Sequence, residues 1–285
     1  MQKINFSTRI NAPKEKVWNS LWEMFHYNTW TSPFAEGSTV QTDNWNEGSK
    51  VLFLDGNGNG MVSMVASNRP NEFMSFKHLG IVKDGMEDTS SKEVKPWTGA
   101  MENYTLNGEN GGTILNIETD ITDDFKEYMM KTWPVALEKL KGLAEGTVKP
   151  VITISAQINA PVAKVWETWT NPEHVMQWNN ASDDWHCPKA SNDLQHGGKF
   201  SFTMAAKDGS FSFDFNGDYN EVKENEFIYA TMGDGRMWKT YFKADGNKTT
   251  VTERFEAETM NSLEMQQAGW QAILNNFKKY AESLN

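Results

Sequence analysis

One acidic side chain in this sequence could lie where it would do chemistry. In segment 248–257, Glu253 has the same strand phase as Val251 and Phe255. Successive residues of a strand face opposite sides. This phase would therefore bury the carboxyl and raise its pKa, making it a candidate general base or a hydrogen-bond partner for a polar ligand. A slip of one residue would turn Glu253 to water, and this outward position is the interpretation we favour.

A histidine next to the single cysteine, His186 and Cys187, is the other reactive combination. Both residue types can bind zinc or form a nucleophile pair, but neighbours on a strand point apart. We therefore expect no metal site and no cofactor, and we expect this segment to be a loop. An enzyme would need several polar side chains to converge in one cavity. The candidates are Glu253, Tyr241, Arg236 and His186.

Aromatic residues are numerous, with 12 Trp and 16 Phe. Such rings can line a cavity for an apolar ligand, or they can fill a core outright, since protein interiors pack at a density of about 0.75. The residues that would line such cavities are Trp30, Met64, Phe76 and Trp133 in the N-terminal half, and Trp178, Phe213, Phe215, Trp238, Tyr241, Glu253 and Trp270 in the C-terminal half.

A repeated motif divides the chain into halves. Asn-Ala-Pro-x-x-x-Val-Trp stands at 11–18 and again at 159–166, and a Trp-x-x-x-Leu spacing at 133–137 recurs at 270–274. Self-similarity of this kind indicates duplicated domains rather than one large domain. The two expected domains span 1–147 and 148–285.

The N-terminal half is longer between equivalent tryptophans. Trp18 and Trp133 are 115 residues apart, whereas Trp166 and Trp270 are 104 residues apart, a difference of 115 − 104 = 11. The polar run 81–97 is the natural place for these extra residues.

Hydrophobic periodicity predicts the same elements in each half. Segments 4–10 and 152–158 alternate as half-buried strands do. Pro13 and Pro161 then open short helices, a second short helix follows, and five or six more strands come after it. Each half ends with a long amphipathic helix, which Pro134 should kink or break in the first half.

These elements define a fold class. Consecutive strands with short turns form an antiparallel sheet, and one amphipathic helix must pack across that sheet to bury its apolar stripe. We therefore predict an α+β protein with two domains. In each, a curved antiparallel sheet would wrap around a long C-terminal helix, with two short helices after the first strand.

The chain resembles the START-like helix-grip superfamily, also called SRPBCC, and within it the homologues of the activator of heat-shock protein 90 ATPase. The resemblance rests on the repeated motif at 11–18 and 159–166, on Gly-Gly-Lys-Phe at 197–200, and on the tryptophan of each long helix. It implies a cavity between sheet and helix, which holds small apolar molecules in many superfamily members. With the aromatic composition, it leads us to expect an open pocket in at least one domain.

Charge and hydropathy exclude several partners. Lys+Arg minus Asp+Glu is 27 − 38 = −11, whereas nucleic acid and anionic membranes need a basic face. No apolar run approaches the ~18 residues of a membrane span, and the first residues lack the apolar stretch of a signal peptide. We expect a cytoplasmic protein with neither nucleic acid nor membrane as a partner.

Three functions are compatible with the sequence and the resemblance. The first is binding of a small hydrophobic or amphipathic ligand in the cavity between sheet and C-terminal helix, with no catalysis assigned. The second is a cyclase-like or hydrolase-like enzyme that uses the same cavity. The third is a co-chaperone-like module that contacts a chaperone. Against the third, the chaperone activators carry a further N-terminal domain that neither half resembles.

Overall fold

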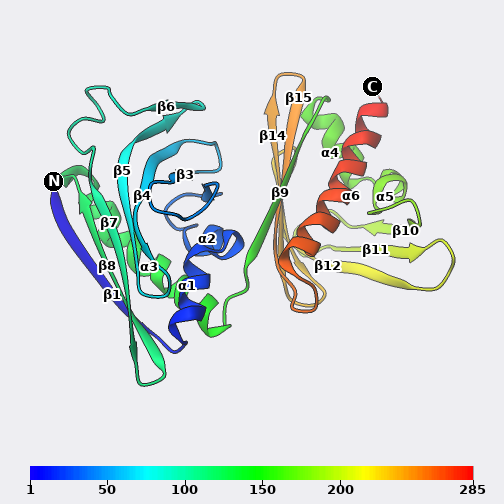
Figure 1. The fold of residues 1–285 in the computed structure, drawn as a ribbon. Helices are drawn as coiled ribbons and strands as arrows, with labels where there is room; N and C mark the ends of the chain where they lie inside the picture. The colour runs from blue at the N-terminus through cyan, green and yellow to red at the C-terminus, as the bar shows by residue number, and fades with distance from the viewer. Residues whose placement is uncertain (285) are drawn as a thin grey trace. The chain divides into compact units, whose positions relative to one another are not determined.

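The computed structural model describes residues 1–284, which form two compact units divided between Pro150 and Val151. Each unit contains one antiparallel sheet, two short helices and one long C-terminal helix (Figure 1). We refer to the units as unit 1 and unit 2. That each of them is an independent domain with the expected boundary after residue 147 stays a prediction.

The sheet of unit 1 has the strand order β1-β8-β7-β5-β4-β3-β2, and β6 pairs with β5 beside this path. Its strands are β1 (Gln2–Ile10), β2 (Thr39–Gln41), β3 (Lys50–Leu54), β4 (Gly60–Arg69), β5 (Phe73–Lys83), β6 (Met86–Asp88), β7 (Met101–Glu109) and β8 (Gly112–Ile121). Its helices are α1 (Lys14–Trp22), α2 (Met24–Trp30), the 3-10 turn η1 (Asp123–Phe125) and α3 (Lys126–Glu145).

The sheet of unit 2 has the order β10-β11-β12-β13-β14-β15-β9. Its strands are β9 (Val151–Ile158), β10 (Trp185–Asn192), β11 (Lys199–Ala206), β12 (Ser212–Lys223), β13 (Phe227–Met232), β14 (Met237–Asp245) and β15 (Lys248–Glu256). Its helices are α4 (Val162–Thr170), α5 (Pro172–Trp178) and α6 (Leu263–Ser283). In both units the first strand pairs with the last, as β1 with β8 and β9 with β15.

The repeated motif secures the turn before the first helix of each unit. Thr113 Oγ1 donates a hydrogen bond to the carbonyl of Ala12 at 2.7 Å, and Thr249 Oγ1 donates to the carbonyl of Ala160 at 2.8 Å. All four residues are buried. The last strand thus satisfies a buried carbonyl of the Asn-Ala-Pro turn, which a buried polar group requires. The duplication inferred from the sequence is confirmed at the level of single hydrogen bonds.

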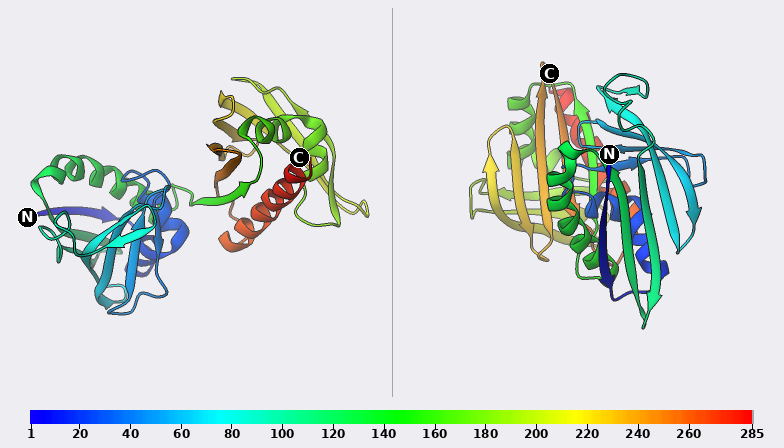
Figure 2. Two further views of the ribbon diagram at one scale, coloured as in Figure 1. Left: turned by 90° about the horizontal axis from the view of Figure 1, so that it is seen from above. Right: turned by 90° about the vertical axis from the view of Figure 1, so that its left-hand side faces the viewer.

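Each long helix packs across one face of its sheet (Figure 2). Helix α3 buries Trp133, Leu137 and Leu140, while α6 buries Leu274 and Phe277. This is the predicted α+β arrangement, a curved sheet closed by a helix.

The break expected at Pro134 is absent, because α3 runs through it without interruption. Pro134 lies on the exposed side of the helix, where a carbonyl that loses its intrahelical donor can turn to water.

Three strands were not expected from the sequence. Two of them, β2 and β6, have only three residues each. The third, β10, occupies the segment that we expected to be a loop around His186 and Cys187. A bulge between His186 and Lys189 interrupts its register, which hides the alternation by which a strand is recognised.

Cys187 is buried on β10, and burial raises the pKa of its thiol to about 11. Within residues 1–284, no three His, Cys, Asp or Glu side chains come together as a metal site would require. None of the helices in this range combines the length and the apolar character needed to span a bilayer.

Candidate functional site

Unit 2 contains a cavity of about 250 Å³ whose walls come from the sheet, the short helices and α6. Its lining is mainly aromatic, with three polar side chains, Asn179, Arg236 and Glu253. Six of the seven residues predicted for this half line it. These are Trp178, Phe213, Phe215, Trp238, Glu253 and Trp270.

The position of Trp270 follows from stacking against the sheet. Its indole lies on Phe255 of β15, with ring centroids 3.9 Å apart and an interplanar angle of 17°. Trp238 of β14 and Phe215 of β12 meet it edge-on, at 6.2 and 5.6 Å. Aromatic pairs favour such stacked and T-shaped arrangements. One helix residue therefore contacts three strands, and this holds α6 at a defined place over the cavity.

Glu253 is only 3% exposed, so the expected outward position is wrong. The register of β15 has no slip, and Glu253 lies opposite Ile154 of β9 and Thr240 of β14. Glu253 therefore faces the interior of the unit, on the same side of β15 as Val251. Trp238 Nε1 donates a hydrogen bond to Glu253 Oε2 at 2.8 Å, which offsets part of the cost of burial.

Burial raises the pKa of Glu253 to about 8, although the hydrogen bond from Trp238 acts in the opposite direction. A carboxyl with this pKa is mostly protonated at neutral pH, so its hydroxyl can donate a hydrogen bond. No hydrogen bond from residues 1–284 reaches Oε1 of Glu253. The cavity thus presents one neutral carboxyl whose bonding capacity is only partly used.

Arg236 brings a positive charge to the same cavity. Its Nε donates to Asp234 Oδ2 at 2.7 Å and its Nη1 donates to the carbonyl of Glu256 at 2.8 Å. These two bonds fix the guanidinium while the side chain is mostly buried. Of the residues that an enzyme would need to converge with Glu253, Arg236 therefore lines the cavity.

Tyr241 and His186 do not line this cavity. Tyr241 is an odd number of residues from Trp238 on β14, so its side chain lies on the opposite face of the sheet. There it packs against Phe227, with ring centroids 4.9 Å apart, and beneath the guanidinium of Arg254. His186 belongs to the edge strand β10. The expected contribution of Tyr241 to ligand binding is thus corrected.

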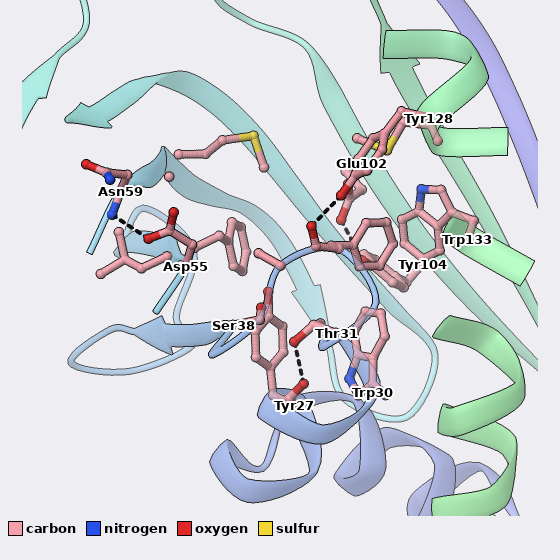
Figure 3. A pocket seen from close by; sticks show the side chains of 17 residues that line it. Tyr27, Trp30, Thr31, Ser38, Asp55, Asn59, Glu102, Tyr104, Tyr128 and Trp133 are labelled. Atoms are coloured by element: carbon pink, nitrogen blue, oxygen red, sulfur yellow. Dashed lines mark hydrogen bonds between the residues drawn. The ribbon is translucent and has the colours of Figure 1, made fainter. Parts of the chain in front are cut away.

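Unit 1 has a corresponding cavity of about 280 Å³. Figure 3 shows Tyr27 and Trp30 on one side of it and Trp133, Tyr104 and Glu102 on another. We call this space and the one in unit 2 the grip cavities. Of the residues predicted for this half, Trp30 and Trp133 line the cavity.

Two other predicted residues, Met64 and Phe76, do not line it. Met64 lies between Ser63 and Val65, which are fully buried, and neighbouring residues of a strand face opposite sides. Phe76 faces inward but is 0% exposed. It packs against Phe53 at 5.1 Å and is part of the solid core.

Glu102 is the polar residue of this cavity that the sequence analysis missed. The hydroxyl of Tyr104 donates to Glu102 Oε1 at 2.5 Å, and His78 Nε2 lies 3.8 Å from Glu102 Oε2. Ser63 Oγ is hydrogen-bonded to His78 Nδ1 at 2.8 Å. Burial, with the adjacent Glu102, raises the pKa of Tyr104 well above its ordinary value. The sequence could have indicated Glu102, because it shares a strand phase with Tyr104 and Leu106 on β7.

Comparison with known proteins addresses the family. The family described as Activator of Hsp90 ATPase homolog 1-like protein matches residues 159–282. The solution structure of an AHSA1-like protein from Aeromonas hydrophila is 42% identical to this chain, over 47% of this chain and 93% of that one, with a TM-score of 0.45. The chain belongs to the AHSA1-like family.

Two further solved structures illustrate the range of likeness to this AHSA1-like chain. Chr148 from Cytophaga hutchinsonii is 50% identical, over 47% of this chain and 92% of that one, with a TM-score of 0.42. The di-domain ARO/CYC BexL from the BE-7585A biosynthetic pathway covers 99% of this chain and 98% of its own, with 12% identity and a TM-score of 0.43. No curated protein matches the chain.

Proposed function

We propose that this AHSA1-like protein binds a small apolar molecule that carries a hydrogen-bonding group, and that it does so in the grip cavity of unit 2. One observation carries the proposal. Glu253 is a nearly fully buried carboxyl in an aromatic cavity, and one of its oxygens has no hydrogen-bond partner within residues 1–284. A carboxyl that only filled a core would be replaced at lower cost by an apolar residue.

The chemistry of the walls limits the ligand. Indole and phenyl rings would contact an apolar, preferably planar, body. The neutral carboxyl of Glu253 would donate to a carbonyl or ether oxygen, or accept from a hydroxyl. Arg236 would favour a ligand with a negative or strongly accepting end. At about 250 Å³ the cavity is slightly smaller than the ~300–1,000 Å³ of most small-molecule sites, so the ligand is small.

The proposal is tested with the full chain, purified gently and examined by native mass spectrometry for a retained molecule. In parallel, quenching of tryptophan fluorescence is titrated with 2-naphthol, an aromatic probe with a single hydroxyl. Binding should saturate and should weaken by about tenfold in Glu253→Leu, because leucine offers the ligand hydroxyl no hydrogen-bonding group in place of the carboxyl.

Glu264→Leu is the matched control, since Glu264 is exposed in the first turn of α6 and does not line the cavity. It should bind the probe as the wild type does. If no molecule is retained and the probe does not saturate, or if Glu253→Leu binds the probe unchanged, the proposal is wrong.

A catalytic function is the second candidate, because a carboxyl with a pKa of about 8 is also in the protonation state that a general acid needs at neutral pH. The two functions differ in the fate of the retained molecule. If it is converted on incubation with fresh protein, and Glu253→Gln keeps the affinity but stops the conversion, the cavity is an active site. If it is recovered unchanged, the protein is a binder.

A further inference from the structure

A second cavity of about 530 Å³ lies in unit 1 beside its grip cavity. The two share wall residues, among them Met61, Glu102 and Met129. The rest of the second cavity comes mainly from β5, from the segment after β6 and from the end of β8 with η1. In unit 2 only residues 233–236 join the equivalent strands β13 and β14. The cavity therefore belongs to the extra residues of unit 1 and not to the duplicated fold.

The lining of this cavity has one sign of charge. Four carboxylates contribute to it, and among the residues that the structure describes no lysine or arginine does. They are Glu93, Glu102, Asp120 and Asp124. Carboxylates around a pocket with apolar walls concentrate a field that attracts cations and repels anions. An anionic ligand is thus disfavoured here.

Two aromatic side chains line the same cavity, Trp97 and Phe125. Phe125 is 58% exposed, which leaves much of its ring without a protein partner. Ring faces attract organic cations, and carboxylates add to this attraction. Aliphatic contacts are available from Ile81 and Ile121. The combination fits a cation with an apolar body better than a hydrated metal ion.

Two of the polar side chains that line the cavity, His78 and Glu102, lie close together. His78 is 4% exposed and its Nδ1 is hydrogen-bonded to Ser63 Oγ at 2.8 Å. Within residues 1–284 its Nε2 makes no hydrogen bond, because Glu102 Oε2, at 3.8 Å, is beyond hydrogen-bonding distance. In the tautomer in which Nδ1 carries the hydrogen and donates it to Ser63 Oγ, Nε2 is an acceptor. A single nitrogen donor could then lie about 2.9 Å from both Nε2 and Oε2.

We propose that this cavity binds an organic ammonium ion whose N–H groups are shared between His78 Nε2 and Glu102 Oε2. The apolar body of the ion lies along Ile81 and Ile121, towards Trp97 and Phe125. The site is separate from the grip cavity of unit 2, so it stands whether or not that cavity binds a ligand.

Three probes of one shape but different charge test the proposal on the full chain at neutral pH and constant ionic strength. They are 2-phenylethylamine, which is protonated, the neutral 2-phenylethanol and the anionic 3-phenylpropionate. In NMR titrations the amine should bind about tenfold more tightly than the alcohol, as a hydrogen bond to a charged group implies, and the acid should bind most weakly. Equal affinity for the amine and the alcohol, or no binding of the amine, would overturn the proposal.

Variants then locate the binding. Trp97→Ala changes this cavity alone, Asp55→Asn changes the grip cavity of unit 1 alone, and Glu102 lines both. Trp97→Ala and Glu102→Gln should each weaken amine binding by about tenfold, while Asp55→Asn should not. Glu138→Gln, an exposed site on α3, controls for the general effect of negative charge. Amine affinity that survives both Trp97→Ala and Glu102→Gln, in variants with native near-ultraviolet circular dichroism, would contradict the proposed site.

Discussion

Each grip cavity contains a carboxyl from its own sheet, and the two carboxyls stand at neighbouring positions of the shared fold but on non-equivalent strands. In unit 1 Glu102 lies on β7, opposite Thr119 of β8. In unit 2 the position that corresponds to Thr119 is Phe255 of β15, and the residue opposite Phe255 is Trp238 of β14. Thr119 pairs with Ile4 and Phe255 pairs with Ile152, so the registers of the two units superimpose. Glu102 and Trp238 are therefore equivalent positions.

The same registers make Ile117 and Glu253 equivalent, since Ile117 pairs with Tyr104 as Glu253 pairs with Thr240. In unit 1 the acid is on the penultimate strand and accepts from a tyrosine on that strand. In unit 2 the acid is on the last strand and accepts from a tryptophan on its neighbour.

The comparison teaches that both units place a hydrogen-bonded glutamate at this part of the cavity, although the strand that carries it and the residue that donates to it differ. The surroundings differ too. Glu102 accepts from a tyrosine hydroxyl and has His78 Nε2 3.8 Å away, whereas Glu253 has one indole N–H and aromatic walls. We expect the two acids to make very different contributions to stability.

The largest expected effect is the dependence of stability on pH that Glu253 produces. Its pKa rises from an ordinary value of 4.5 to about 8 in the folded protein. Between these values the folded state holds a proton that the unfolded state has lost, so stability falls as pH rises through this window. At ~1.4 kcal/mol per pKa unit the full loss is about 5 kcal/mol.

The measurement is the thermal unfolding of the wild type and of Glu253→Gln at pH 5 and pH 9, followed by calorimetry. The variant carries no titrating group at this site, so it should lose much less stability between the two pH values than the wild type. Other groups titrate equally in both proteins and cancel in the comparison. Parallel pH profiles for the two proteins would show that Glu253 is not held neutral by burial.

A smaller effect is expected on removing the donor in unit 2. Trp238→Phe deletes the Nε1–H that bonds Glu253 Oε2 and leaves a buried carboxyl without a partner, which costs about 2–3 kcal/mol. The bond favours the ionised acid, so its loss should also move the pH at which stability is lost to a higher value.

Trp185→Phe separates this effect from the loss of ring volume. Trp185 packs on Phe211 and Phe213, is partly exposed and has no hydrogen bond to a carboxylate in the described part of the chain. It should leave the pH profile unchanged. If both variants shift the profile equally, the hydrogen bond is not what sets the pKa of Glu253.

Most of the fold could be predicted because it depends on periodicity within single segments. The alternation of segments 4–10 and 152–158 and the long amphipathic helices required only the spacing of apolar residues. The edge strand β10 was missed because its bulge breaks that spacing. Helix α3 survives Pro134 because the residue faces water, which spacing alone does not reveal.

The sites were harder because they depend on contacts between segments. Strand phase alone would have excluded Tyr241, given an inward Trp238, and would have included Glu102, given an inward Tyr104. No phase rule distinguishes Phe76, which fills the core, from Trp30, which lines the cavity. That distinction requires knowing which side chains from other strands lie next to each ring.

The smallest of the three effects is expected in unit 1. Tyr104→Phe removes the hydroxyl that bonds Glu102 Oε1. The side chain of Glu102 is 13% exposed, so the carboxyl can bond to water instead. A loss of about 1 kcal/mol, the net value of one intramolecular hydrogen bond, is therefore expected. Chemical denaturation at pH 7 measures the unfolding free energy of this variant and of Trp238→Phe under the same conditions. Trp238→Phe should lose more unfolding free energy than Tyr104→Phe, because only the acid of unit 2 is surrounded by aromatic rings. The reverse order would mean that the acid of unit 1 is the more isolated of the two.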